Sequence, residues 1–155
     1  MMVTIRNAVR GDIPELADLL GELFTLEREF SPDRTSQIRG LIMLFDRGDA
    51  VRIMTAEREG RIIGLGVLHY TVSTYLGAKV AVLEDVVVTA GERGKGTGSR
   101  LMAGIIERAR ADGVSRITLL TDHDNSAAQS FYESFGFVRS TMVPHRLMLQ
   151  PTLSA

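Results

Sequence analysis

The segment from Glu84 to Arg100 contains residue types that bind an anion. A strand-like apolar run at 86–88 leads into a loop with four glycines and two basic residues at 91–98, and a helix-like pattern follows. Glycines let the backbone approach an anion closely, and the helix after them presents unpaired N–H groups and the positive end of its dipole. Phosphate is the ligand that this chemistry favours, although a loop of this composition taken alone is also compatible with solvated charges.

Two common phosphate-binding patterns do not fit this loop. A P-loop requires a lysine followed by serine or threonine, but Lys95 is followed by Gly96. A dinucleotide fingerprint that starts at Gly94 requires glycine or alanine at position 99, where the chain has Ser99. Both interpretations are therefore disfavoured.

A third pattern matches the chain in two places. Arg93, Gly96 and Gly98 form the spacing Arg-x-x-Gly-x-Gly, and here the sequence resembles the GNAT N-acetyltransferases. Downstream, the letters N-x-x-A-x-x-F-Y-E-x-x-G-F, which start at Asn125, resemble the second recurrent signature of that family. Because the two motifs lie one helix and one strand apart, as in that family, the chain is identified as a member of it.

The resemblance implies that acetyl-coenzyme A is the co-substrate, with its pyrophosphate on the backbone amides of Arg93–Ser99. It also implies that main-chain groups of Val86 and Val88 pair with the pantetheine amides, and that no metal takes part. For Ala128 and Phe131, packing in the core is the alternative role. The implied coenzyme-binding residues are Val86, Val88, Arg93, Gly94, Lys95, Gly96, Thr97, Gly98, Ser99, Asn125, Ala128 and Phe131.

Acetyl transfer to an amine needs a base and an acid. The amine is protonated at neutral pH, so a proton must leave before nitrogen attacks the thioester, and the thiolate departs more easily when it is protonated. The match to the family tyrosine implies that Tyr132 is the acid; the alternative is an aromatic core residue whose hydroxyl bonds to backbone. Glu84 is the candidate base, because period-two alternation would place it on the strand face of Val86 and Val88, with Asp85 facing the other way. A structural carboxylate is the alternative for Glu84.

The predicted function is transfer of acetyl from acetyl-coenzyme A to a primary amine of a small molecule. The run Leu83-Glu84-Asp85 resembles the strand of GNAT enzymes that acetylate polyamines and related small amines, where the glutamate acts through water. Glu27 and Glu29 could attract a cationic amine, or they could simply be solvated. A peptide or protein N-acetyltransferase and a non-catalytic acyl-coenzyme A sensor remain the alternatives.

The elements that must position these residues can be predicted from periodicity. A capping box formed by Asp12 and Glu15 predicts a helix start there, and Glu59-Gly60 predicts a hairpin turn. The fold class is α+β, with a mixed, mostly antiparallel central sheet and the order β-α-α-β-β-β-α-β-α-β-β. The strands are expected at residues 3–8, 50–58, 61–72, 78–89, 117–121, 137–140 and 145–149. A first helix is expected to start after residue 12, and further helices are expected at residues 36–45, 98–113 and 126–135.

Composition limits the remaining function classes. The chain has 155 residues, of which 45% are apolar, and this predicts one domain at 1–151 with a short tail at 152–155. With 18 Lys and Arg against 19 Asp and Glu, we expect neither nucleic acid nor a membrane as a partner. The chain has no cysteine, which excludes disulfides and thiolate zinc sites but leaves the compartment open. No signal-like segment precedes the first strand and no stretch is apolar enough to span a bilayer, so we expect a soluble cytoplasmic protein. The family resemblance implies a homodimer.

Overall fold

The computed structural model describes residues 2–27 and 29–150. The chain forms two compact units, Met1–Leu119 and Leu120–Ala155. The first unit holds a five-stranded sheet with helices on both faces, and the second holds one helix, α4 (Ser126–Glu133), with the chain on either side of it. Among the described residues, no helix is both long enough and apolar enough to cross a bilayer.

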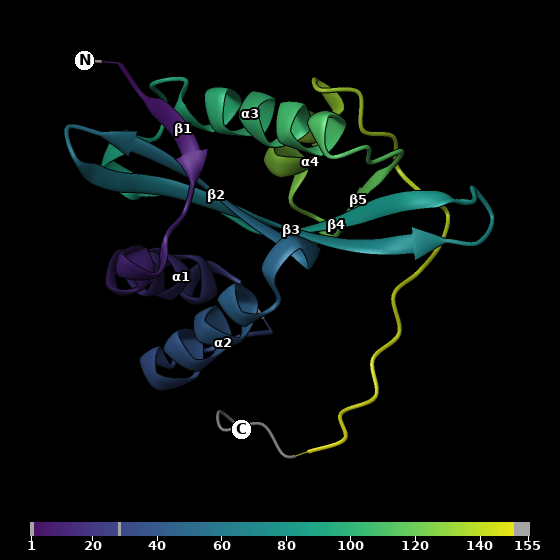
Figure 1. The fold of residues 1–155 in the computed structure, drawn as a ribbon, viewed down its shortest axis with the longest axis horizontal. Coiled ribbons are helices and arrows are strands. Elements are labelled where there is room, and N and C mark those ends of the chain that lie inside the picture. The colour runs from purple at the N-terminus through teal and green to yellow at the C-terminus, as the bar shows by residue number, and fades with distance from the viewer. Residues whose placement is uncertain (1, 28, 151–155) are drawn as a thin grey trace. The chain divides into compact units, whose positions relative to one another are not determined.

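The sheet of the first unit is mixed and mostly antiparallel, as the sequence predicts. Its strands are β1 (Thr4–Asn7), β2 (Val51–Arg58), β3 (Arg61–Ser73), β4 (Ala78–Val88) and β5 (Ile117–Leu119), and they lie in that order across the sheet (Figure 1). The first four are joined antiparallel, whereas β4 and β5 run parallel. A parallel pair needs a crossover connection, and α3 (Thr97–Ala111) supplies it.

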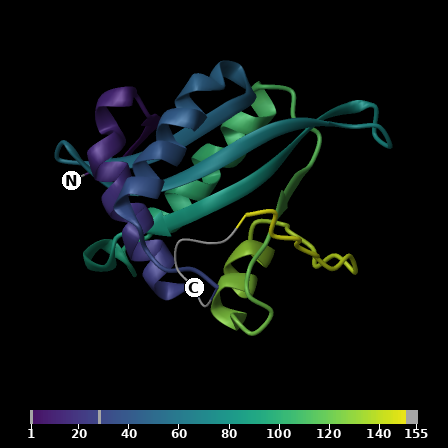
Figure 2. The same cartoon turned by 90° about the horizontal axis from the view of Figure 1, so that it is seen from below.

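Helices cover both faces of this sheet. The helices α1 (Ile13–Leu26) and α2 (Arg34–Asp46) lie on one face and α3 lies on the other (Figures 1 and 2). The core on the α1/α2 face is made by buried apolar side chains such as Leu16, Leu41 and Val67. On the α3 face the packing is so close that a Cβ at Gly66 would lie 2.6 Å from Cδ1 of Ile105. A glycine in β3 is therefore what lets α3 approach the sheet.

The hairpin between β2 and β3 forms where the sequence predicts it. Glu59 and Gly60 both have positive φ, at 51° and 77°. Two successive left-handed residues give a turn whose twist matches that of the flanking strands. This hairpin is therefore confirmed.

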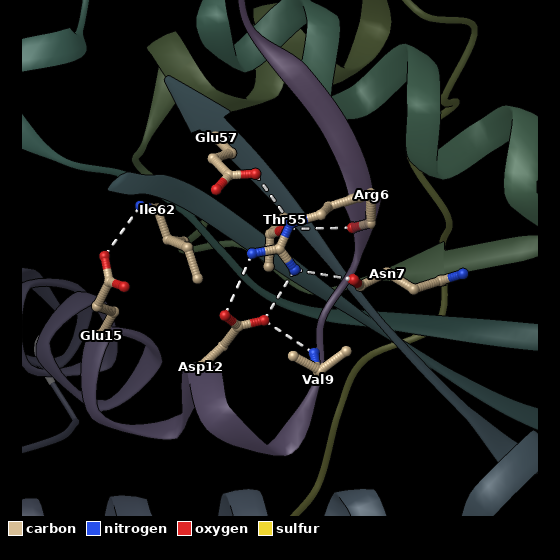
Figure 3. Close-up of polar contacts among 8 residues, drawn as sticks. All are labelled: Arg6, Asn7, Val9, Asp12, Glu15, Thr55, Glu57 and Ile62. Carbon is tan, nitrogen blue, oxygen red and sulfur yellow. Dashed lines mark hydrogen bonds and ion pairs between the residues drawn. The ribbon is translucent and has the colours of Figure 1, made fainter. Parts of the chain in front are cut away.

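The start of α1 differs from the predicted capping box. Asp12 makes no side-chain bond to the first turn of α1. Its carboxylate instead accepts hydrogen bonds from Arg6 in β1, at 2.8 and 3.2 Å, and from the backbone N–H of Val9 (Figure 3). Glu15 accepts from the backbone N–H of Ile62, at 3.0 Å. Both acids therefore join α1 to the sheet, because a guanidinium and a strand end lie within reach once the chain has folded.

The last two predicted strands, at 137–140 and 145–149, are wrong for this structure. Neither segment has regular secondary structure, so the element order ends after α4. A strand exists only when its backbone pairs with another, and no ladder forms along these residues. Their apolar side chains are exposed, at 89% for Val138 and 83% for Leu147. The predicted tail at 152–155 lies outside the described residues.

Candidate functional site

The glycine-rich loop joins the end of β4 to the start of α3. A short 3-10 turn at Ala90–Glu92 follows the strand, and Gly96 occupies the position before the first residue of α3. Gly94 and Gly96 have φ values of 79° and 81°, and a Cβ at either position would meet nothing within 4 Å. The loop therefore requires glycine there for conformation and not for lack of space. It leaves the first N–H groups of α3 without helical partners, as an anion site needs.

The charged side chains of the loop are partly compensated. Nε of Arg93 donates to the carbonyl of Val88, at 3.0 Å, so this side chain folds back onto β4. Glu92 accepts from Nε of Arg58, at 3.2 Å, and lies 3.9 Å from Nζ of Lys95. The bond to Val88 orients Arg93 and leaves its positive charge in place, whereas Glu92 offsets part of the charge of Arg58 and Lys95.

Thr97 adds a polar atom with no protein partner at the first turn of α3. The residue is 1% exposed, and its Oγ1 is the one buried side-chain polar atom without a hydrogen bond in the part of the chain that the structure describes. A buried hydroxyl without a partner is costly in a folded protein. Because this hydroxyl is closed to solvent, it does not count among the donors that the loop offers to a ligand.

The loop is also anchored to α1, through a residue that sequence reasoning missed. Glu22 accepts from the hydroxyl of Thr89, at 2.8 Å, and from the backbone N–H of Ala90, at 3.2 Å. These two bonds hold the loop start against a helix far away in the sequence. No local pattern in α1 distinguishes Glu22 from an ordinary surface acid.

One edge of β4 remains open beside this loop. β5 pairs with β4 only along Ala81–Leu83, and no strand among the described residues pairs with 84–88 on that side. The side chains of Val86 and Val88 lie on the α3 face, next to the positions of Gly66 and Gly64. The open edge is the kind of gap in which an extended ligand can pair with main-chain groups.

A β-bulge interrupts β4 just before these valines. Val67 of β3 pairs with Glu84, but Leu65 pairs with Val87, so Asp85 and Val86 together oppose a single residue of β3. Asp85 has a φ of 59°, in the left-handed region. The extra residue shifts the alternation of side chains by one position. The predicted alternation of side chain faces along 84–88 therefore does not hold across the bulge.

The bulge overturns the predicted orientation of Glu84. Residues directly opposite in an antiparallel pair share a face, so Glu84 lies with Val67 on the α1/α2 face. Val86 lies on the α3 face. The expectation that Glu84 shares a face with Val86 and Val88 is wrong, because period two fails at a bulge. Glu84 remains next to the bulge, 55% exposed, with Oε2 at 3.6 Å from Nε2 of His69.

Asp85 is the second carboxyl at the bulge, and it is mostly buried. Burial, followed by the charges of Glu84 and Glu27, raises the pKa of Asp85 to about 7. Glu27 is the residue at which α1 ends. The prediction that Asp85 faces away from Glu84 rests on regular alternation, which fails at the bulge.

The second unit carries the other predicted residues on α4. Asn125 begins this helix, where its Oδ1 accepts from the backbone N–H of Ala128, at 3.1 Å. The ring of Tyr132 packs edge to face against Phe131 and Phe137, at centroid distances of 5.5 and 5.8 Å. Asn125 therefore has a capping role in this structure, and contacts of this helix with the coenzyme remain predictions.

The structure thus brings the predicted site residues together in two groups. In the first unit Val86, Val88 and the whole loop Arg93–Ser99 are continuous along β4 and α3. In the second unit Asn125 to Tyr132 follow one another on α4. A cavity of about 280 Å³ between β1, β2 and the end of α2 contains none of these residues.

A mixed sheet whose fourth strand is bulged and open along one edge, followed by a glycine loop and a helix, is the architecture of an acyl-coenzyme A-dependent transferase. The chain belongs to the acetyltransferase (GNAT) family, whose model matches residues 13–137. It is therefore an N-acetyltransferase that depends on acetyl-coenzyme A.

Two curated relatives and one solved structure illustrate the range of this family. The chain is 30% identical to an uncharacterized N-acetyltransferase, YhfO, of Bacillus subtilis (strain 168), over 96% of this chain and 99% of that protein. It is 27% identical to the thialysine N-epsilon-acetyltransferase of Bos taurus, over 86% of this chain and 83% of that protein. A structure described as "a possible acetyltransferase" from Clostridium difficile 630 superposes with a TM-score of 0.86, at 16% identity, over 97% of this chain and 100% of that one. The last likeness concerns the fold alone.

Proposed function

We propose that this protein transfers the acetyl group of acetyl-coenzyme A to a primary amine of a small molecule. The observation that carries the proposal is the pair of carboxyl groups at the β4 bulge, Glu84 and Asp85, directly before the open strand edge and the glycine loop. Carboxylates at this place suit a cationic amine in need of deprotonation. The bovine relative is named for the amine that it acetylates, which supports a small amine.

The first unit offers a continuous binding path for the coenzyme. Its pyrophosphate is assigned to the amides of Arg93–Ser99, where the start of α3 provides donors. Its pantetheine arm is assigned to the open edge of β4 at Val86 and Val88. From α4, Asn125, Ala128 and Phe131 are proposed to line the arm.

The chemistry needs three contributions from the chain. A carboxylate at the bulge, for which Glu84 is the candidate from sequence, takes a proton from the acceptor ammonium. The amine then attacks the thioester carbon, and backbone N–H donors stabilise the oxyanion. Tyr132 is proposed to donate a proton to the sulfur as the carbon–sulfur bond breaks, so that a neutral thiol leaves.

We also propose that the protein acts as a homodimer. Apolar side chains are exposed at the end of the hairpin between β3 and β4, at 71% for Val72 and 92% for Tyr75, and this end projects beyond the helices in Figure 2. Burying such residues between two copies would be favourable. Sedimentation that shows only monomer at micromolar concentration would contradict this proposal.

A panel of acceptors tests the proposed reaction. Purified protein and acetyl-coenzyme A are mixed with small primary amines or with lysine-containing peptides, and thiol release and product mass are recorded. We expect acetylation of at least one small amine. Turnover on peptides alone would favour a peptide acetyltransferase, and coenzyme binding without turnover on any amine would favour an acyl-coenzyme A sensor.

A further inference from the structure

We infer that Asp85, rather than Glu84, receives the proton of the acceptor ammonium, and that Glu84 assists through its charge. This inference rests on the proposed transfer to an amine. It follows from the backbone at the bulge, from the burial of Asp85 and from the groups that surround it.

The backbone conformation of Asp85 indicates a special position. A φ of 59° is uncommon for a residue other than glycine, and within the described part of the chain only Glu59, in a hairpin turn, shares it. Asp85 lies inside a long strand, where an ordinary residue would stay extended. Such conformations persist where the surrounding structure enforces them, and they concentrate at functional sites. At the bulge Asp85 and Val86 share one opposing residue of β3, so Asp85 stands outside the regular alternation of the strand.

The surroundings of Asp85 differ from those of other buried acids in the chain. Asp12 accepts two hydrogen bonds from Arg6, which lower the pKa of Asp12. Burial would raise the pKa of Asp112, but hydrogen bonds from Arg108 and Arg52, with one from a tyrosine, hold it below its usual range. Asp85 has no hydrogen bond or ion pair with any described residue. Both other acids are paired for structure, and Asp85 is not.

The charged groups that act on Asp85 come from two elements. Glu84 precedes it in β4, and Glu27 follows the end of α1. His69 in β3 contacts Glu84, at 3.6 Å. The carboxylates of Glu84 and Glu27 beside Asp85 favour the binding of a cation, because it offsets their mutual repulsion. The protonated amine is the cation that the proposed reaction supplies. With a pKa of about 7, Asp85 can accept a proton at neutral pH and release it again afterwards.

The proton balance of the reaction is complete with this assignment. The ammonium gives one proton to the Asp85 carboxylate and becomes a neutral amine. A carbon–nitrogen bond then forms and the carbon–sulfur bond breaks as Tyr132 donates its proton to sulfur. The second proton that leaves nitrogen restores the Tyr132 hydroxyl. The products are the N-acetyl amine and the coenzyme thiol, and Asp85 returns its proton to water.

Three charge-neutralising variants test the inference through the pH profile of kcat/KM. Asp85→Asn should lower kcat/KM about 100-fold or more, and the acid limb near pH 7 should disappear. Glu84→Gln should cost less activity and should move the acid limb to lower pH, because it removes a charge that raises the pKa of Asp85. Glu107→Gln, at an exposed position of α3, changes the net charge equally and should leave the profile as it is.

Two results would overturn the inference. One is a large loss of activity in Glu84→Gln together with a near-normal rate in Asp85→Asn. The other is an acid limb that stays in place in Asp85→Asn. Binding of acetyl-coenzyme A, followed by thermal shift, shows for each variant that the fold is retained.

A measurement without turnover separates this inference from the proposed function. NMR titration of 13C-labelled side-chain carboxyls should show one group that titrates near pH 7 in the wild type and is missing in Asp85→Asn. If that group is absent, the assignment to Asp85 is wrong even when amines are acetylated. If it is present and no amine is acetylated, the proposed function has failed instead.

Discussion

Replacing Asp85 by asparagine should stabilise the protein at alkaline pH relative to the wild type. Asparagine has nearly the same shape, and it tolerates the left-handed conformation that Asp85 adopts. The variant therefore keeps the bulge and removes one ionisable group. Any change of stability that depends on pH can then be attributed to the charge.

The sign follows from the direction of the pKa shift. The pKa of Asp85 rises from 3.8 to about 7 through burial and the charges of Glu84 and Glu27. Folding therefore favours the protonated form. The stability contributed by that form is complete below pH 3.8 and is lost as the pH rises through about 7. The wild type should lose stability over this range relative to the variant.

The magnitude follows from the same two values. A shift from 3.8 to about 7 is about 3 units, which at about 1.4 kcal/mol per unit gives an upper limit of about 4 kcal/mol. At about pH 5 the raised pKa of Asp85 already lowers the unfolding free energy of the wild type by about 1.6 kcal/mol of this limit. The difference in unfolding free energy between variant and wild type should therefore widen by about 2–3 kcal/mol between about pH 5 and about pH 8.5.

Urea unfolding at several pH values measures this difference. The change with pH is the quantity compared, because a constant offset from the amide itself cancels. Glu107→Gln serves as the control, and its difference from the wild type should not change with pH in this way. Parallel stability curves for Asp85→Asn and the wild type would refute the reasoning, since Asp85 would then ionise alike in the folded and unfolded states.

Three further predictions concern the coenzyme and the acid. Gly96→Val should abolish binding of coenzyme A, because valine resists the φ of 81° on which the loop depends. The fold should survive, because an added Cβ meets no protein atom within 4 Å, and calorimetric titration with an unchanged affinity would show that the phosphate site lies elsewhere. Glu22→Gln should weaken coenzyme affinity about 3- to 10-fold, since the loop start loses two charge-assisted bonds; equal affinity would mean that the loop holds its shape alone. Tyr132→Phe should lower kcat about 100-fold or more with little change in coenzyme affinity, and a near-normal kcat would remove Tyr132 from the mechanism.

The sequence by itself determined the features that depend on neighbouring residues. The glycines of the loop, the helix after them and the turn at Glu59-Gly60 all lie where the letters predict them. Periodicity and turn chemistry act over a few residues, so they can be recognised in one chain without its fold. The class of sheet followed from the order of these local elements, and the family followed from the two motifs at Arg93–Gly98 and Asn125–Phe137.

Tertiary structure alone decided which side chains meet. Asp12 pairs with Arg6 instead of capping α1, and Glu22 holds a loop 67 residues away. The bulge at Asp85 depends on the register between β3 and β4, and one extra residue reversed the face of Glu84. The register of a strand is set by the whole packed sheet and not by the strand itself. The sequence pattern of one strand therefore predicts regular alternation even where the folded sheet contains a bulge. For the same reason the strand predicted at 145–149 does not form, because no partner ladder is present along these residues.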